Sequence, residues 1–241
     1  MKSKKNYRSV VIDILNNIKP NAILDTPSGD GWLLNGLNFT VDIDGIDLFE
    51  KKPKGYGCFT NSDLDCGIPD SMANYDAVVS CEGIEHVGNP LLLLETIKKH
   101  LVDEGVLIIT TPNTWFPGAK VQYFLRGFFP GFPCLVGKIA RGTHMHITPW
   151  SFAHLYLFLK MSGFSEIRLH DVPEAKPKHF YEWFVGMPQW VYCKLKERSS
   201  STREEKLFWS DAGSRQSIYE LLSNVVYGLL KRQPVFDRQF V

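Results

Sequence analysis

The chain has 241 residues, a formal net charge of +1, and 44% hydrophobic against 22% charged residues. These proportions are those of an ordinary globular protein, and the length suits one domain with attachments. A charge so close to zero gives no general attraction to nucleic acid, so no nucleic-acid partner is expected. The five cysteines are scattered and form no C-x-x-C pair, which predicts neither a zinc site nor a disulfide framework and fits a reducing compartment.

The amino-terminal residues are basic, but no long apolar region follows them, so we expect no signal peptide. Apolar side chains between residues 7 and 18 recur at helical spacing, which predicts an amphipathic helix that ends before Pro20. No run of about 18 apolar residues is present, so no membrane-spanning helix is expected. Together these features predict a cytoplasmic protein.

Predicted strands and helices alternate over the first half of the chain. Residues 90–101 predict a helix with a proline in its first turn, and residues 103–105 predict a turn. Alternation of strands and helices is typical of a parallel, doubly wound α/β sheet. Short apolar runs predict the strands at 22–25, 41–47, 57–60, 75–80 and 106–110.

The character of the sequence changes after Pro112. Residues 114–142 are rich in aromatic residues, glycine and proline, and a connection this long predicts an inserted lid or binding loop. Apolar residues over 218–230 recur at helical spacing, which predicts a helix that covers the sheet or forms a homodimer contact. We expect a main domain over 1–198 and a helical extension over 199–241. Between these segments, the predicted elements are a helix at 151–161 and strands at 166–170 and 190–195.

The stretch 25–31, with the sequence DTPSGDG, follows the first predicted strand. Gly29 and Gly31 remove Cβ atoms that would keep a ligand away from the backbone, and the next predicted helix offers free N–H groups. A dinucleotide-binding loop would need a third glycine in a G-x-G-x-x-G pattern, whereas Trp-Leu-Leu follows here at 32–34. The pattern therefore predicts a bound ligand and argues against a dinucleotide.

The same stretch resembles the first motif of the class I S-adenosylmethionine-dependent methyltransferases, Asp/Glu-x-Gly-x-Gly-x-Gly, with Pro27 in place of the first glycine. Proline variants of this motif are familiar from the small-molecule branch, among quinone-biosynthesis-like members. The resemblance continues in order over about residues 20–170. It includes the strand-four stretch at 76–87, which contains Glu-His-Val at 85–87, and a strand-five ending of Thr-Pro-Asn at 111–113.

The resemblance implies S-adenosylmethionine as the cofactor and assigns residues to it. Asp47, at the end of the second predicted strand, would accept hydrogen bonds from the ribose hydroxyls, which an ionised carboxylate can do for two neighbours at once. Asp63 and Leu64 would contact the adenine amino group and the base, although an Asx turn explains Asp63 equally well.

The residues after the fourth strand, Cys81 and Glu82, would border the methionine portion of the cofactor by the same resemblance. Glu85 and His86 match the family's signature on the helix side, and His86 is equally well explained as a structural histidine. The expected cofactor-binding residues are thus Asp25, Pro27, Gly29, Gly31, Asp47, Asp63, Leu64, Cys81 and Glu82.

On the acceptor side, His-x-x-Thr-Pro at 146–149 resembles the family segment that borders the substrate pocket. A hydroxyl or phenol nucleophile benefits from a base with a pKa near the working pH, most often histidine. His146 is therefore the first candidate for the catalytic base and His144 the second, while an anchoring role for His146 at the next helix start is the alternative. A His-x-His metal site lacks an evident third ligand, so no metal is expected.

The stretch from residue 105 to 165 contains no Asp or Glu, but it holds five lysines and arginines. We therefore expect the lid at 114–142 to be apolar and positive, which suits an amphipathic, anionic acceptor or peripheral contact with a membrane. The alternative is a small extra core that covers the sheet.

These observations predict a Rossmann-like, doubly wound, seven-stranded α/β sheet with an antiparallel seventh strand, the inserted lid and the helical extension. The expected function is methyl transfer from S-adenosylmethionine to an oxygen of a small-molecule, lipid-linked or glycan-linked acceptor. A non-catalytic S-adenosylmethionine-binding regulatory module remains an alternative. Aminopropyl transfer is a further alternative, but it would need acids on the acceptor side that the sequence lacks.

Overall fold

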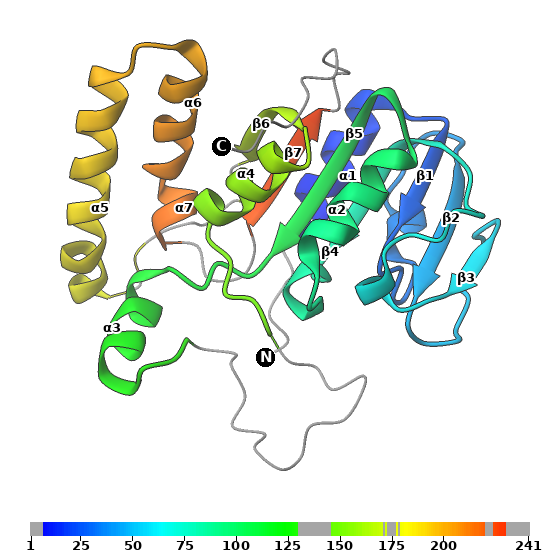
Figure 1. Cartoon of the computed structure of the whole chain (residues 1–241), viewed down its shortest axis with the longest axis horizontal. Coiled ribbons are helices and arrows are strands. Elements are labelled where there is room, and N and C mark those ends of the chain that lie inside the picture. The colour runs from blue at the N-terminus through cyan, green and yellow to red at the C-terminus, as the bar shows by residue number, and fades with distance from the viewer. Residues whose placement is uncertain are drawn as a thin grey trace, which may run out of the picture.

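A computed structural model of the chain describes residues 7–129, 146–170, 172, 177, 179–219 and 224–229. Its centre is a seven-stranded sheet in the order β3-β2-β1-β4-β5-β7-β6 (Figure 1). Strands β1 to β5 pair in parallel, and β7 pairs antiparallel with both β5 and β6, which confirms the predicted sheet. The strands are β1 Ala22–Asp25, β2 Asp42–Asp47, β3 Phe59–Asn61, β4 Tyr75–Cys81, β5 Leu101–Thr111, β6 Ser165–His170 and β7 Asn224–Leu229.

The central strands are buried on both faces because helices cover both sides of the sheet. Neighbouring residues of a strand point to opposite faces, so Val78 and Val79 of β4 belong to different hydrophobic clusters. Helix α1 Tyr7–Ile18 contributes Val11 and Leu15 to one cluster. Helices α2 Pro90–Lys99 and α4 Phe152–Met161 contribute to the other cluster.

The helix starts follow the capping signals in the sequence. The Asn89 side chain accepts a hydrogen bond from Leu92 N–H before α2, and Pro90 occupies the first turn. Ser151 caps α4 in the same way, through the N–H of His154. The expected turn at 103–105 interrupts the pairing within the longer strand β5, where Glu104 has a φ of +62°.

The strand predicted at 190–195 is wrong, because these residues lie in helix α5 Phe180–Ser199. The run contains aromatic and β-branched residues that favour a strand, but its burial follows a helical spacing. Gly186 and Cys193, seven residues apart, are buried on one face of α5, and α5 packs beside α6 Arg203–Ala212 and α7 Arg215–Tyr219 (Figure 1). Tertiary packing therefore overrides the local preference.

The helix predicted over 218–230 is wrong at residues 224–229, which form β7, whereas residues 218 and 219 belong to helix α7. This strand joins the sheet between β5 and β6, with Tyr227 opposite Ile108 and Arg168. An apolar run with several valines can form either a helix or a strand. Here the backbone pairs with β5 on one side and β6 on the other, which favours the strand. Val226 is consequently buried in the sheet, so residues 224–229 present no helical face for the expected homodimer contact. The segment after residue 199 is not purely helical.

Among the residues described, none of the helices is long and apolar enough to cross a membrane.

Candidate functional site

The loop after β1 is fastened to both neighbouring strands. The N–H of Thr26 donates to the carbonyl of Val79 at 2.8 Å, and the N–H of Ser28 donates to the carbonyl of Ile46 at 2.9 Å. Pro27, which follows a cis peptide bond, lies against the loop after β4, because a Cβ on Gly83 would come within 2.3 Å of its Cδ. The proline thus joins the loops after β1 and β4 at the carboxyl edge of the sheet.

The two glycines of this loop serve different purposes. Both have left-handed backbone angles, with φ of +51° at Gly29 and +70° at Gly31. A Cβ on Gly31 would come within 2.4 Å of the Cβ of Pro53, whereas a Cβ on Gly29 would meet no atom within 4 Å. Gly31 is therefore required by the protein's own packing, and Gly29 leaves its backbone open to a ligand.

Asp47 ends β2 beside Gly29, where its carboxylate is 7% exposed. Its Oδ2 accepts from the N–H of Gly29 at 2.9 Å, and its Oδ1 accepts from the N–H of Phe49 at 3.0 Å. A carboxylate offers roughly four acceptor positions, so this one retains capacity for two hydroxyl groups. The open backbone at Gly29 and this fixed carboxylate fit the ribose of a nucleoside cofactor.

Tyr56 is a site residue that sequence reasoning missed. It lies between β2 and β3, is 4% exposed, and donates its hydroxyl to Oδ2 of Asp25 at 2.5 Å. Burial raises the pKa of Asp25, and the hydrogen bond from Tyr56 opposes that rise. The one available signal was an aromatic residue between Gly55 and Gly57. Asp25 and Tyr56 thus form a buried support behind the loop.

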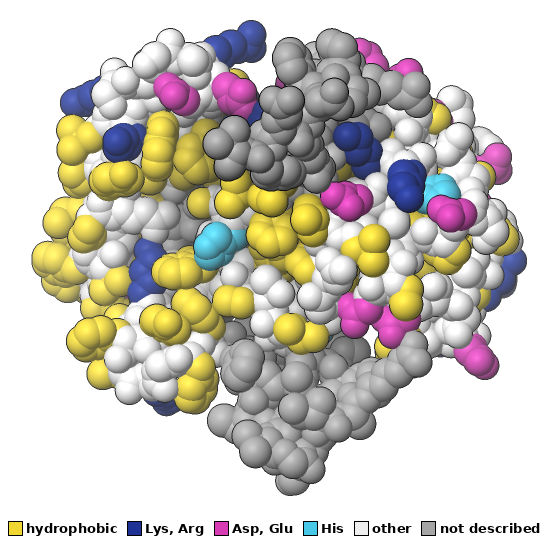
Figure 2. All heavy atoms as spheres, viewed as in Figure 1, with side chains coloured by type: hydrophobic (Ala, Val, Ile, Leu, Met, Phe, Trp, Pro, Cys, Tyr) yellow, Lys and Arg dark blue, Asp and Glu magenta, His cyan; other side chains and the backbone are white. Residues whose placement is uncertain are grey.

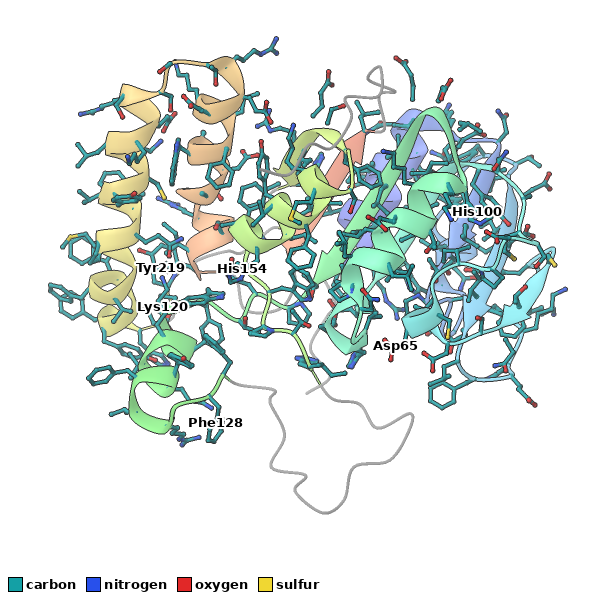
Figure 3. All side chains as sticks on the ribbon, viewed as in Figure 1. Asp65, His100, Lys120, Phe128, His154 and Tyr219 are labelled. Atoms are coloured by element: carbon teal, nitrogen blue, oxygen red, sulfur yellow. The ribbon has the colours of Figure 1, made fainter. Side chains whose placement is uncertain are left out.

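The loop after β3 gives Asp63 a structural task. Its side chain accepts from the N–H of Asp65 at 3.1 Å and caps the short helix Leu64–Cys66, which is the Asx-turn alternative. Asp65 in turn accepts from the N–H of Gly88 at 2.6 Å and ties this loop to the one after β4 (Figure 3). Leu64 is 9% exposed and belongs to the main core, so an adenine contact by this pair stays a prediction.

The residues after β4 lie against both β5 and the amino-terminal helix. Glu82 has a φ of +55°, and its N–H donates to the carbonyl of Thr110 at 2.9 Å. Burial and then the charge of Asp25 raise the pKa of the Cys81 thiol, which keeps it protonated. Burial and then the charge of Glu82 raise the pKa of the Tyr7 phenol. Tyr7, which the sequence did not reveal, thus brings α1 to the methionine side of the expected site.

His146 lies beside Glu85 and His86, which come directly after β4 in the short helix Ile84–His86. The imidazole rings of His86 and His146 are 5.1 Å apart at an angle of 72°. Burial and then the neighbouring His86 lower the pKa of His146, so its imidazole is neutral at neutral pH. His144 lies outside the described residues. The order Glu-His after strand four was visible in the sequence, but its pairing with His146 was not.

The described residues of the lid are 114–129, and they contain helix α3 Pro117–Arg126, which packs against α5. The ammonium of Lys120 donates to Oε1 of Gln189 on α5, and burial lowers the lysine's pKa (Figure 3). Phe124 and Leu125 are 87% and 72% exposed. Figure 2 shows hydrophobic side chains gathered over this side of the molecule, where α3 and α5 lie. Residues 130–142 of the lid lie outside the described residues.

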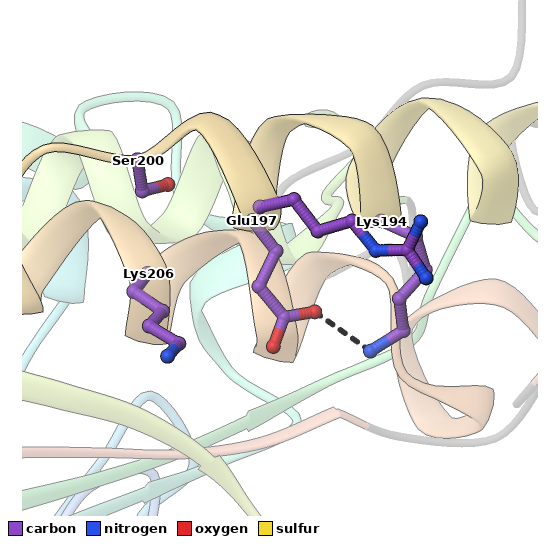
Figure 4. Close-up of a pocket in the computed structure, with 5 residues that line it drawn as sticks. Lys194, Glu197, Ser200 and Lys206 are labelled. Atoms are coloured by element: carbon purple, nitrogen blue, oxygen red, sulfur yellow. Dashed lines mark hydrogen bonds and ion pairs between the residues drawn. The ribbon is translucent and has the colours of Figure 1, made fainter.

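Two hollows in the described surface are lined by other residues. One lies between α5 and α6, where Lys194 and Glu197 form an ion pair of 2.7 Å that solvent screens (Figure 4). The other, of about 260 Å³, is lined by Trp115, His154 and Gln189 among others, and it is smaller than the roughly 300–1,000 Å³ of ligand pockets. Neither hollow is lined by a predicted cofactor residue, so neither is the predicted cofactor site.

A family model described as a methyltransferase domain matches residues 3–165. The plantazolicin methyltransferase BpumL, bound to S-adenosylhomocysteine, aligns with 14% identity and a TM-score of 0.54 over 96% of this chain and 86% of that chain. The Burkholderia thailandensis 1,6-didemethyltoxoflavin-N1-methyltransferase aligns with 13% identity and a TM-score of 0.54 over 95% and 80% of the two chains. A SAM-dependent methyltransferase from Archaeoglobus fulgidus aligns with 13% identity and a TM-score of 0.51 over 92% and 94%.

No match was found among curated proteins. The structural neighbours share the fold at low identity, whereas the family match covers more than half of the chain. It spans the loop after β1, the end of β2 and the stretch after β4, where the sequence resembles the family's motifs. The chain therefore belongs to the class I S-adenosylmethionine-dependent methyltransferases.

Proposed function

We propose that this protein transfers a methyl group from S-adenosylmethionine to an oxygen atom of a small-molecule, lipid-linked or glycan-linked acceptor. The observation that carries the proposal is the fixed carboxylate of Asp47 beside the open backbone of Gly29. A protein that bound no nucleoside would have no need of a buried carboxylate with spare acceptor capacity at this edge.

In this proposal, Asp47 binds the ribose hydroxyls, and Gly29 allows the cofactor close to the backbone. Asp25 is a further cofactor residue in this proposal, and its Oδ2 also accepts the hydroxyl of Tyr56 behind the loop. When bound, S-adenosylmethionine supplies a methyl group already activated by the sulfonium. The remaining cofactor contacts that we propose are Pro27 and Gly31 in the loop, Asp63 and Leu64 at the adenine, and Cys81 and Glu82 at the methionine portion.

On the acceptor side, we assign His146 to the reacting hydroxyl and keep His144 as the second candidate. A lowered pKa leaves the His146 imidazole neutral, and a neutral imidazole can help an acceptor hydroxyl to lose its proton. This favours oxygen over nitrogen as the methylated atom, since an amine acceptor needs such help less.

The acceptor that we propose is amphipathic. Exposed aromatic and aliphatic residues on α3 and α5, including Phe124, Phe180 and Trp183, support contact with an apolar portion of the acceptor or with a membrane surface. Peripheral membrane contact through 114–142 belongs to the same proposal. A cytoplasmic location accords with the cofactor, which this compartment supplies.

Calorimetric titration with S-adenosylmethionine and S-adenosylhomocysteine tests the proposal, using the parent protein and an Asp47→Asn variant. We expect micromolar binding by the parent and a loss of at least about tenfold in the variant, since an amide offers one acceptor oxygen fewer. Asp42→Asn is the matched control, because Asp42 is an exposed residue of the same strand. The absence of binding of either ligand by folded parent protein would refute the proposal, and binding without transfer to any acceptor class would favour a regulatory module.

A further inference from the structure

Three side chains with metal-ligating atoms meet just beyond the carboxyl end of β4. They are Glu85 and His86 of the short helix Ile84–His86 and His146 from the segment before α4. One ligating atom of each lies within 4.8 Å of the others. Glu85 is buried at 2% exposure, and both histidines are partly buried.

Hydrogen bonds from neighbouring residues hold Glu85 in place in this cluster. The hydroxyl of Thr111, at the end of β5, donates to Oε2 of Glu85 at 3.0 Å. The N–H groups of Ile147 and Thr148 donate to the backbone carbonyl of Glu85 at 2.8 and 3.3 Å, which fixes His146 beside it. Oε1 of Glu85 points to the other side and lies 3.9 Å from Nε2 of His86. Hydrogen bonds that orient ligands in this way are typical of metal sites.

The geometry points to a divalent cation site formed by Glu85, His86 and His146, with a first-row transition metal such as Mn²⁺, Fe²⁺, Co²⁺ or Zn²⁺ as its occupant. Two imidazoles and one carboxylate are a ligand set that these metals accept, whereas Mg²⁺ and Ca²⁺ prefer oxygen ligands throughout. Metal–ligand bonds of about 2.0–2.2 Å place neighbouring ligand atoms roughly 3.0–3.5 Å apart, so rotation of the side chains suffices to close the cluster.

The catalytic part of this inference rests on the proposed function. Three protein ligands leave coordination positions open, and the site borders the residues expected beside the methionine portion of the cofactor. A cation there would bind the acceptor hydroxyl and lower its pKa. The hydroxyl proton passes to water, the oxygen forms its bond to the methyl carbon, and the methyl–sulfur bond breaks to leave a thioether. With the cation bound, His146 would help the acceptor hydroxyl to lose its proton through the cation, whereas in the metal-free protein its neutral imidazole would do so directly.

The test is a metal titration of the full-length protein after removal of metal with a chelator. Bound Mn²⁺ is measured by electron paramagnetic resonance and bound Co²⁺ by its visible absorption, in the parent and in His86→Ala and His146→Ala. We expect one bound cation per chain in the parent and affinity at least tenfold weaker in each variant. His154→Ala is the matched control, because His154 is an exposed histidine on α4 outside the cluster, and we expect parental affinity from it.

Two results would overturn the inference. One is parent affinity no higher than that of the cluster variants, which would leave Glu85 and His86 as a simple ion pair. The other is equal loss in His154→Ala, which would indicate adventitious surface binding. Should His86→Ala fail to fold, His146→Asn provides the same comparison at a partly exposed position. Calorimetry with S-adenosylmethionine on the metal-free protein keeps the two proposals apart, since failure of cofactor binding would refute the proposed function and leave the metal titration valid.

Discussion

The carboxyl ends of β1 and β2 and the segment after β4 hold their polar groups in different ways. At the first place, Asp47 and Asp25 are fixed by the N–H of Gly29 and the hydroxyl of Tyr56. At the second, ligating atoms of Glu85, His86 and His146 lie close to one another, and the hydroxyl of Thr111 donates to Oε2 of Glu85. The cofactor side is thus organised by the protein itself, whereas the acceptor side gathers three ligating groups around a common point.

This difference indicates that protein contacts fix the arrangement of the cofactor side, whereas a bound ligand would complete the arrangement of the acceptor side. On the cofactor side, the sheet register and short loops fix where each side chain lies. Substitutions there should therefore change both the free energy of unfolding and the affinity for the cofactor. The acceptor side is assembled from segments that lie far apart in the chain, at residues 85–86 and 146. The following substitutions separate these contributions.

The largest effect on stability is expected for Gly31→Ala. The new Cβ would lie within 2.4 Å of Pro53 in a residue with φ of +70°, and we expect the free energy of unfolding to fall by about 3 kcal/mol. Gly29→Ala is the matched control, because its Cβ meets no protein atom within 4 Å. It should cost only about 1 kcal/mol for its left-handed backbone, while cofactor affinity falls at least about tenfold.

Urea unfolding of the two variants and calorimetry with S-adenosylmethionine measure these effects. Equal loss of stability in both would mean that Gly29 is also needed by the protein's own packing. Unchanged cofactor affinity in Gly29→Ala would mean that no ligand approaches the backbone at this residue.

Asp211→Ala tests whether the helical region is integral to the sheet. Asp211, on α6, accepts from Nε and Nη2 of Arg168 at 3.0 and 3.2 Å and from the N–H of Leu169 at 3.1 Å, both on β6. Its loss leaves a buried backbone N–H without its acceptor, and we expect a cost of about 2 kcal/mol in a single unfolding transition. Glu204 is also on α6 and forms an exposed ion pair with Lys160 on α4. Glu204→Ala should therefore cost about 0.5 kcal/mol or less.

Differential scanning calorimetry of the parent and the two variants compares their thermal unfolding transitions. Two separate transitions in the parent, with only the smaller one shifted by Asp211→Ala, would show that α5 and α6 unfold independently of the sheet.

Tyr56→Phe is expected to destabilise the protein by about 1.5 kcal/mol near neutral pH, because Asp25 loses its hydrogen-bond donor while still buried. The folded-state pKa of Asp25 is already raised by burial, so ionising it costs stability as the pH rises above its unfolded value of about 3.9. The variant raises that pKa further. Its penalty should therefore be larger at about pH 8 than at about pH 4, where Asp25 is protonated in the folded state of both the parent and the variant.

Tyr75→Phe is the control for this pH dependence. Its hydroxyl donates to Oδ2 of Asp44 at 2.8 Å, but that carboxylate is only half-buried and also accepts from the N–H of Cys58. Denaturant unfolding at the two pH values should show a smaller penalty and a weaker pH dependence for Tyr75→Phe. The same pH dependence in both variants would contradict the role given to the burial of Asp25.

The site residues at the strand ends were predictable from sequence, because the last residue of β1 and of β2 is also the acidic residue expected to bind the ligand. An acid that ends an apolar run, as Asp25 and Asp47 do, lies at the carboxyl edge of a parallel sheet whatever the remaining fold. The partners of these acids were less visible, since Tyr56 reaches Asp25 across a connection of irregular structure. The pairing of Glu85 with His146 depends on backbone hydrogen bonds between distant segments, which no local pattern encodes.

The segment after residue 180 was harder for a different reason. The runs at 190–195 and 218–230 contain apolar residues that satisfy both a helical and a strand period, so their environment decides between the two. Residues 190–195 pack against a neighbouring helix, and Cys193 therefore lies in α5. Residues 224–229 pair with a strand on each side, and Val226 therefore lies in β7. The seven-stranded sheet with one antiparallel strand was therefore predicted correctly, but a different segment supplies the antiparallel strand.

The smallest effect on stability belongs to the lid. Phe124 and Leu125 are almost fully exposed on α3, so the double variant Phe124→Ser, Leu125→Ser should change the free energy of unfolding by no more than about 0.5 kcal/mol. If α3 contacts a membrane, the variant should bind anionic lipid vesicles several-fold more weakly in a sedimentation assay, because buried apolar area drives such binding. Leu157→Ser, on α4 and 54% exposed, is the matched control and should bind as the parent does. Equal binding by all three proteins would assign the apolar surface of α3 to the acceptor alone, since contact with a soluble amphipathic molecule needs no affinity for a bilayer.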